Sequence, residues 1–217
     1  MNTLDYGAPF GFLLKDKGWV KKFAIASLLT YTLIGAAPVL GWTIEIVRRV
    51  ARGEEPVIPE LKDWKLFWRL GGKFAFVNAL WLLPLLLAVL LLYGVPALLI
   101  GRVADESVIL VFGGTLCCVI AFLFVYSIVY IFFIPPMMAA LARGDSAWQA
   151  ASPARLWKIA RPHFFEYLML FLIVGVALLN VLFFLSALTL FLLLPPMLVY
   201  AGLVTAHFTG QLATNKE

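Results

Sequence analysis

The stretch FAFVNALWLLPLLLAVLLLYGVPALLIG (residues 74–101) contains 28 residues without a single Asp, Glu, Lys or Arg. An α-helix needs about 20 such residues to cross the roughly 30 Å hydrocarbon core of a bilayer. Shortly before it, RRVARGEEPVIPELKDW (residues 48–64) carries eight charged side chains among 17 residues. A long apolar run next to a dense charged segment indicates a membrane helix that begins beside a loop in water.

The composition of the whole chain agrees with this interpretation. Mean hydropathy is +0.97, and 63% of the 217 residues are hydrophobic whereas 13% are charged. Soluble proteins carry about 25% charged residues, so the sequence predicts an all-α integral membrane protein. The net charge of +5 comes from loops beside apolar runs, where basic residues set the orientation of the chain in the membrane. We therefore expect no nucleic-acid partner.

Three further runs lack charged residues, namely 23–44, 107–142 and 167–215. Their hydrophobicity is continuous rather than alternating, which argues against a transmembrane β-barrel, and lipid offers the backbone no hydrogen-bond partners, which requires helices. We predict a polytopic helical bundle, with residues 1–22 as a cytoplasmic amphipathic segment and residues 23–217 as a single transmembrane domain. The expected membrane legs lie near residues 23–47, 74–101, 107–142, 164–185 and 187–210.

Basic residues are concentrated within 1–22, 48–73 and 143–161. The positive-inside rule places these segments in the cytoplasm, and the last apolar run returns the chain to the same side. We therefore expect a multi-pass protein of the cell membrane with both termini cytoplasmic. The first apolar run is flanked by basic residues at both ends, so the sequence leaves open whether it crosses once or forms a broken or re-entrant hairpin.

Prolines indicate where the legs break, because proline lacks a backbone donor and its ring clashes with the preceding turn. The predicted breaks are at Pro38, Pro135, Pro136, Pro195 and Pro196. One hypothesis is that the Gly35–Pro38 break and the two proline pairs line a common central region. The alternative is that each pair ends one helix and starts another at the surface.

Short Trp-bearing basic segments recur before the apolar runs, as in the two LKD tripeptides at residues 14–16 and 61–63. This recurrence predicts about three helical-hairpin units, each entered through an interfacial amphipathic helix. We expect such helices near residues 59–70 and 152–161, attracted to anionic lipid headgroups. Plain anchoring is one interpretation of these helices, and a docking platform for a cytoplasmic partner is the other. The candidate anchors are Trp19, Trp64, Trp68, Trp157 and Lys158.

Two segments carry a resemblance to a known family. GWTIEIVRRVARGEEPVIPELKDWKLFW (residues 41–68) and ARGDSAWQAASPARLWKIARPHFFEYLML (residues 142–170) resemble the prokaryotic membrane family called domain of unknown function 4013. The resemblance covers roughly residues 10–210, and Leu61-Lys62 departs mildly from the family pattern. It implies a membrane architecture and no particular mechanism.

Four polar residues lie in or near the apolar runs and are candidate intramembrane positions, because such groups are costly in lipid unless they serve packing or function. Glu45 can pair with an arginine of the following helical turn. Asn78 and Asn180 are interpreted as hydrogen-bonding groups between helices, and His207 as a hydrogen-bonded packing residue rather than a proton or ligand site.

The sequence contains no HExxH, no phosphate loop and no nucleophile beside a base, so we expect no catalytic, cofactor-binding or metal site. The leading hypothesis is a non-enzymatic membrane protein that acts as a subunit, scaffold or membrane-organising factor, with lipid and a protein partner or a second copy as its contacts. The alternative is a transporter or channel for a small or lipid-like solute, and a lipid-modifying enzyme is the weakest hypothesis.

Overall fold

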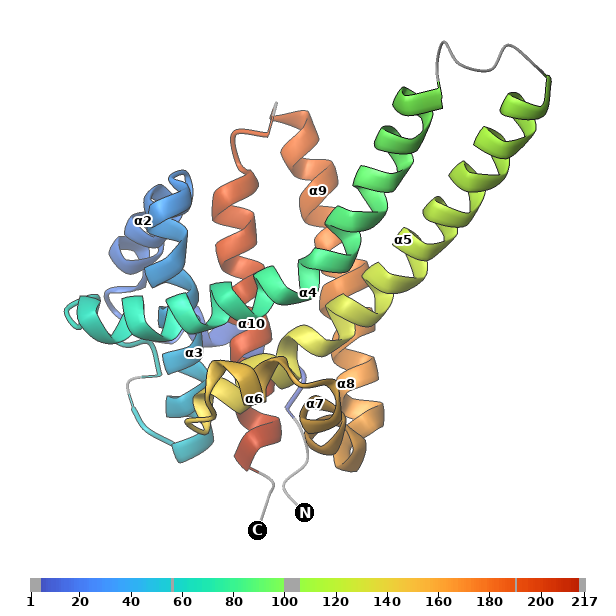
Figure 1. Cartoon of the computed structure of the whole chain (residues 1–217). Coiled ribbons are helices and arrows are strands. Elements are labelled where there is room, and N and C mark those ends of the chain that lie inside the picture. Colours follow the sequence, from blue (N-terminus) through green and yellow to red (C-terminus); the bar gives the residue numbers. More distant parts are fainter. Residues whose placement is uncertain (1–4, 56, 100–105, 190, 215–217) are drawn as a thin grey trace. The chain divides into compact units, whose positions relative to one another are not determined.

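The computed structural model describes residues 5–55, 57–99, 106–189 and 191–214, and throughout these residues the regular structure is helical (Figure 1). No strand occurs among them, so the chain is an all-α protein, as predicted. The elements in chain order are α1 (Ala8–Lys15), α2 (Trp19–Thr30), α3 (Leu33–Arg52), α4 (Trp64–Leu99), α5 (Glu106–Ala142), α6 (Ala147–Ala151), α7 (Pro153–Ala160), η1 (Arg161–His163), α8 (Phe164–Leu170), η2 (Phe171–Leu178), α9 (Leu179–Leu188) and α10 (Leu194–Thr214).

Three helical stretches among the described residues are long and apolar enough to cross a membrane: Trp64–Leu92, Gly113–Ala142 and Pro153–Leu188. The third is continuous through α7, η1, α8, η2 and α9, and its η2 segment is a π-helix. The chain is therefore an all-α membrane protein. By their contacts its residues form two units, one of residues 1–77 with 132–217 and one of residues 78–131.

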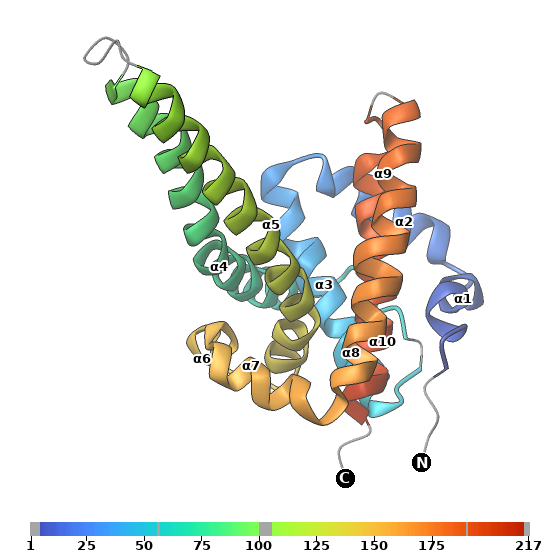
Figure 2. The same ribbon diagram turned by 90° about the vertical axis from the view of Figure 1, so that its right-hand side faces the viewer.

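The second unit is an antiparallel hairpin made by the later part of α4 and the earlier part of α5 (green in Figures 1 and 2). Two tyrosines of α5 join the helices. The Tyr126 hydroxyl donates to the Trp81 carbonyl at 2.7 Å, and the Tyr130 hydroxyl donates to Asn78 Oδ1 at 2.5 Å. Among the described side chains of this unit, most of the other large apolar ones are exposed, as suits a hairpin whose solvent is lipid.

The first unit is built around α3 and α10, which pack along each other. Trp42, Ile44, Ile46 and Val47 of α3 are completely buried, as are several residues of α10. The amphipathic pattern of α3 explains why this helix lies in the core. Its apolar residues recur at helical spacing and form one face. The other face, near the end of the helix, carries Glu45, Arg48, Arg49 and Arg52.

The closest approach in the unit is between α3 and the first part of α4, at Gly41 and Gly71. A Cβ added to Gly41 would overlap the carbonyl oxygen of Phe67 and would lie 2.8 Å from the nitrogen of Gly71. A Cβ added to Gly71 would overlap the carbonyl oxygen of Ala37 and would lie 2.9 Å from the nitrogen of Gly41. The two backbones touch, so only glycine fits at either position. Small residues allow this kind of contact between membrane helices.

The break in the first apolar run lies at Tyr31–Thr32, and Figure 2 shows α2 and α3 running in different directions from it. The Thr32 side chain accepts from the Gly35 backbone N–H at 3.0 Å and so caps α3. The predicted break at Pro38 is wrong, because α3 continues through this residue. Pro38 is buried, and tertiary packing outweighs the local cost of one lost backbone hydrogen bond.

The other predicted breaks have mixed outcomes. Pro135 and Pro136 lie inside α5, which is one helix from Glu106 to Ala142, so the prediction of a break there is wrong. Both are buried, and their surroundings hold the helix together. Pro195 and Pro196 lie in the first turn of α10, where backbone N–H groups have no partner in the helix and proline costs little. Three proline breaks around one central region therefore do not exist.

Two predicted boundaries also shift. The leg expected to end near residue 185 continues as α9 to Leu188, and the last leg, expected from residue 187, begins as α10 at Leu194. Phe191, between α9 and α10, has a positive φ of 63°. The interfacial helix expected over residues 59–70 begins instead at Trp64 and runs on as α4, whereas α7 (Pro153–Ala160) lies within one residue of its predicted bounds at each end.

The late start of α4 has a physical cause in the α3–α4 loop. The Trp42 indole Nε1–H donates to the Pro59 carbonyl at 3.1 Å, and Lys22 Nζ donates to the Ile58 carbonyl at 3.1 Å. Lys22 also forms an ion pair with Asp16 at 2.7 Å. These carbonyls bond to α2 and α3 rather than within a helix. The loop is thereby held against the core, with Ile58 only 1% exposed.

The α3–α4 contact predicts a sharp difference between two adjacent glycines. Gly71→Ala should reduce the free energy of unfolding by about 1–3 kcal/mol, because backbone atoms must move apart to admit the methyl group. Gly72→Ala should leave it unchanged or raise it by up to about 1 kcal/mol, because open space surrounds Gly72 and alanine favours helix. Denaturant titration in detergent micelles measures both. Equal effects at the two positions would contradict the contact.

The Asp16–Lys22 pair predicts a pH dependence. Burial alone would raise the pKa of Asp16, but hydrogen bonds from Lys22 and the Gly18 backbone N–H hold this pKa below the usual 3.8. A lowered carboxyl pKa contributes stability above that usual value, and this contribution disappears as pH falls through the folded-state pKa. The unfolding midpoint of the wild-type protein should thus exceed that of Asp16→Asn at pH 7, and the gap should close below pH 3.8.

Glu54→Gln is the matched control, because its pair with Arg52 at 3.4 Å is largely exposed and such pairs contribute little. Its midpoint should follow that of the wild-type protein throughout the titration. A gap between wild type and Asp16→Asn that stays constant down to pH 2 would show that the Asp16 charge does not stabilise the fold.

Candidate functional site

One end of the first unit gathers the ends of several segments that are distant in sequence. Thr214 Oγ1, near the end of α10, donates to the Ala51 carbonyl at 3.3 Å. Gln211 Nε2 donates to the carbonyl of Asp5 at 3.3 Å, and Phe208 packs against Tyr6 with ring centroids 6.0 Å apart. The first and last described segments of the chain therefore meet beside the basic end of α3.

Arg48 connects this end to α5. Its Nε donates to the Ala142 carbonyl at 2.9 Å and its Nη2 to the Leu141 carbonyl at 3.3 Å. These carbonyls belong to the last turn of α5, where a helix leaves acceptors without partners and a cation is favoured. Glu45 lies 3.6 Å from Arg48 and 3.8 Å from Arg49, so the structure places Glu45 in ion pairs at helical spacing that hold the capping arginine.

His207 lies in α10 at the same end and is 8% exposed. Its ring packs on Phe12 with centroids 4.6 Å apart, and its Nδ1 lies 3.2 Å from Gln211 Nε2. It lines a cavity of about 120 Å³ whose walls come from α1, the α1–α2 turn, the α3–α4 loop and α10. The lining residues are Ala8, Phe12, Lys15, Asp16, Glu55, Val57, Ile58 and His207.

The two asparagines have different roles. Asn78 accepts the hydrogen bond from Tyr130 and so joins α4 to α5. Asn180 Nδ2 donates to the Val176 carbonyl, one turn earlier in its own helix, at 2.5 Å, and among the described residues no hydrogen bond from Asn180 to another helix is found. The interpretation of Asn180 as a group that holds two helices together is therefore wrong. A carbonyl one turn earlier in the same helix can accept this hydrogen bond with a smaller loss of conformational entropy than a group on a second helix.

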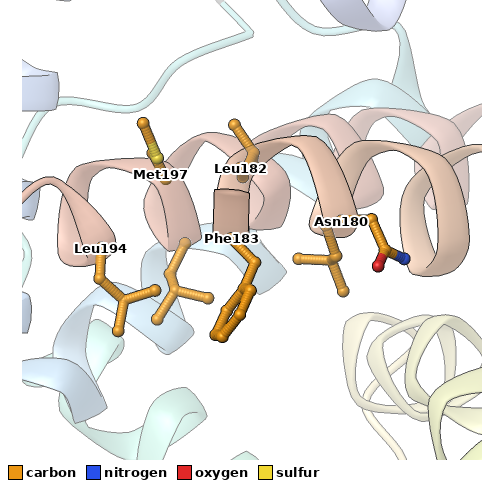
Figure 3. Close-up of a pocket in the computed structure, with 7 residues that line it drawn as sticks. Asn180, Leu182, Phe183, Leu194 and Met197 are labelled. Atoms are coloured by element: carbon orange, nitrogen blue, oxygen red, sulfur yellow. The ribbon is translucent and has the colours of Figure 1, made fainter. Parts of the chain in front are cut away.

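Asn180 instead lies at one end of an open groove between α9 and α10 (Figure 3). The groove has a volume of about 280 Å³, and apart from Asn180 its walls are apolar: Leu179, Leu182, Phe183, Leu194, Met197 and Leu198. Ser186 Oγ contacts Met197 Sδ at 3.0 Å where the two helices face each other. The size and lining suit an acyl chain.

The Trp anchors lie on helices whose opposite faces are buried in the protein. At the start of α4, Trp64 and Trp68 are 38% and 45% exposed, whereas Phe67 and Leu70 are 1% and 3% exposed. In α7, Trp157 is 46% exposed and Lys158 is exposed, whereas Leu156 is fully buried. Trp19 is half-buried beside Phe23. Protein contacts thus cover part of the apolar surface of each helix, whereas Trp64, Trp68 and Trp157 stay exposed.

The cavity beside His207 and the capping of α5 by Arg48 were not predicted from the sequence. Both depend on residues far apart in sequence, and a single sequence gives no direct signal for such pairs. The charged segment itself was a partial signal, because Arg48, Glu55 and Ile58 all lie within it or beside its boundary. Among the described residues, no group of three or more His, Cys, Asp or Glu side chains is arranged to hold a metal ion.

Comparison with known proteins identifies the family of this chain. No curated protein and no solved structure matches the chain. Residues 24–209 match the family described as a protein of unknown function (DUF4013), and this range includes α3 to α9, most of α2 and most of α10. The match also covers both segments on which the resemblance was based. The chain belongs to the DUF4013 family.

Proposed function

We propose that this protein is a non-enzymatic, multi-pass subunit or scaffold of the cell membrane, which holds anionic lipid and a protein partner at its cytoplasmic face. The observation that carries the proposal is the pair of exposed basic-aromatic faces on α4 and α7. Trp64, Lys65, Trp68 and Arg69 are exposed on the first turns of α4, and Arg155, Trp157 and Lys158 are exposed on α7.

The buried apolar sides of these helices support a scaffold. Phe67 and Leu156 are buried and fix the helices to the protein, so the backbone positions that carry the exposed side chains are set before any lipid or partner binds. Tryptophan favours the headgroup level of a bilayer, and each basic residue near an anionic surface contributes about 1 kcal/mol. Preorganised groups lose less entropy on binding than flexible ones.

The non-enzymatic part of the proposal rests on the sequence. Charged residues of the three candidate spans are confined to their first turns, up to Lys73 in one and Glu166 in another, and the span Gly113–Ala142 has none. Intramembrane ionisable groups usually mark proton or ion pathways. Their scarcity favours a structural role over ion-coupled transport or catalysis.

The second candidate function is transport of a lipid-like solute. The groove between α9 and α10 favours it, since an apolar surface groove open to the bilayer admits an acyl chain. Purification in mild detergent separates the two candidates. A protein partner retained in stoichiometric amount favours a subunit, whereas a chain purified alone that moves fluorescent lipid between leaflets of reconstituted vesicles favours transport.

The proposed cytoplasmic location of both termini can be tested with fused reporter proteins. The hydrogen bond between Asp5 and Gln211 brings the two described chain ends to one end of the unit, and the basic residues beside them favour the cytoplasm. Green fluorescent protein fused to either end should fluoresce, and alkaline phosphatase fused to either end should stay inactive. An active phosphatase at the N-terminus alone would mean an odd number of crossings and would refute this topology.

The proposal also predicts a preference for anionic lipid. In reconstituted vesicles, brominated phosphatidylglycerol should quench Trp fluorescence more than brominated phosphatidylcholine, because Trp64 and Trp68 lie beside Lys65 and Arg69. The double variant Lys65→Gln/Arg69→Gln should lower the affinity for phosphatidylglycerol, relative to phosphatidylcholine, at least fivefold. The reason is that each basic charge near an anionic surface contributes about 1 kcal/mol.

The matched control is Arg52→Gln/Lys62→Gln, which removes two exposed cations that are paired with Glu54 and Glu60. This control should keep the lipid preference of the wild-type protein. Two results would contradict an interfacial role for the basic-aromatic face of α4. One is Trp fluorescence that is quenched by aqueous iodide and not by brominated lipid. The other is a control variant that loses its preference for phosphatidylglycerol as much as Lys65→Gln/Arg69→Gln does.

A further inference from the structure

The cavity beside His207 has the features of a binding site, and the first of them is the histidine itself. His207 is 8% exposed, yet it lines the cavity. A Gln side-chain nitrogen can only donate, so Nδ1 of His207 accepts from Gln211 Nε2 at 3.2 Å. The proton of the neutral ring is then on Nε2. Within the part of the chain that the structure describes, this Nε2–H has no hydrogen-bond partner.

The charges around the cavity supply the second observation. Asp16 is already paired with Lys22 at 2.7 Å and accepts from the Gly18 backbone N–H at 2.7 Å. Lys15 and Glu55 remain, one from α1 and one from the α3–α4 loop. They have opposite charges, and no ion pair between them is found among the described residues. A cavity that keeps two opposite charges apart suits a ligand that carries both signs.

The walls limit the size and shape of that ligand. The volume of about 120 Å³ corresponds to about four waters at their liquid volume. Phe12, Val57 and Ile58 provide apolar walls, which suit a short carbon linker between two charged ends. A simple anion would meet the Glu55 carboxylate, and a simple cation would meet the Lys15 ammonium.

We propose that this cavity binds a phosphoethanolamine group, with its phosphate oxygens at Lys15 and His207 Nε2–H and its primary ammonium at Glu55. The same chemical group occurs as the headgroup of phosphatidylethanolamine and as a free small molecule. A choline group has no N–H to donate to Glu55 and is bulkier by three methyl groups. The proposal is independent of the basic-aromatic faces on α4 and α7.

The surface beside the cavity suits the lipid form of this group. On α1 and α2, Leu14 and Val20 are 68% and 61% exposed, next to the exposed Lys17 and Lys21. An exposed surface of apolar and basic side chains is typical of the membrane interface. An acyl chain can therefore lie outside the cavity while the headgroup enters it.

The test measures binding to the full chain in detergent with two probes. Native mass spectrometry with phosphatidylethanolamine, phosphatidylcholine and phosphatidylglycerol of equal acyl length tests the lipid form. Calorimetric titration with phosphoethanolamine tests the free form. Phosphatidylethanolamine should bind about tenfold more tightly than phosphatidylcholine, as expected when one charge-assisted hydrogen bond is lost. Binding of the lipid alone identifies a headgroup site, and binding of both probes identifies a site for the free group as well.

Four variants complete the test. Lys15→Gln and Glu55→Gln should each weaken binding about tenfold, whereas their exposed sequence neighbours, Lys17→Gln and Glu54→Gln, should change it less than twofold. All four positions are exposed, so the variants fold. Equal binding of phosphatidylethanolamine and phosphatidylcholine with no binding of phosphoethanolamine, or equal losses in the cavity variants and their controls, would overturn the proposal.

Discussion

The contact between the backbones at Gly41 and Gly71 is the constraint on which the rest of the first unit depends. It brings α4 against α3 closely enough that a Cβ on either residue would overlap a carbonyl oxygen of the other helix. Such a contact relies on dispersion over a tightly fitted surface. Because α3 also packs along α10, this one crossing sets the position of the first part of α4, up to Val77, relative to both helices.

The α3–α4 loop follows from this arrangement. Since the beginning of α4 is held beside α3, the loop must return across the core, and Trp42 and Lys22 bind its Pro59 and Ile58 carbonyls. The loop in turn forms one wall of the cavity beside His207. The same crossing leaves Trp64 and Trp68 exposed on the outer side of α4. Packing inside the protein thus determines which side chains of α4 stay exposed and which residues line the cavity.

Long uncharged runs predicted two of the three candidate membrane spans. α4 includes residues 74–99 of the expected leg 74–101, whose last two residues lie outside the described residues, and α5 includes all of residues 107–142, because lipid leaves an apolar chain no other hydrogen-bonded structure. The third candidate span, Pro153–Leu188, begins before its uncharged run does. The prolines were misleading, since Pro38 and Pro135 lie in helices that buried packing sustains. Local rules work where lipid surrounds the chain. They fail where other helices surround it, because those contacts join residues such as Arg48 and Ala142 that are distant in sequence.

The most direct test of the central contact is a double-mutant cycle with Gly41→Ala and Gly71→Ala, measured as free energies of unfolding in detergent micelles. Either methyl group forces the same two backbones apart, so the second substitution should cost little once the first is present. The double variant should therefore be more stable than the sum of the single effects implies, by at least about 1 kcal/mol, within the range found for residues in contact. Additivity within about 0.5 kcal/mol would show that the two glycines do not share one contact and would contradict this account of the fold.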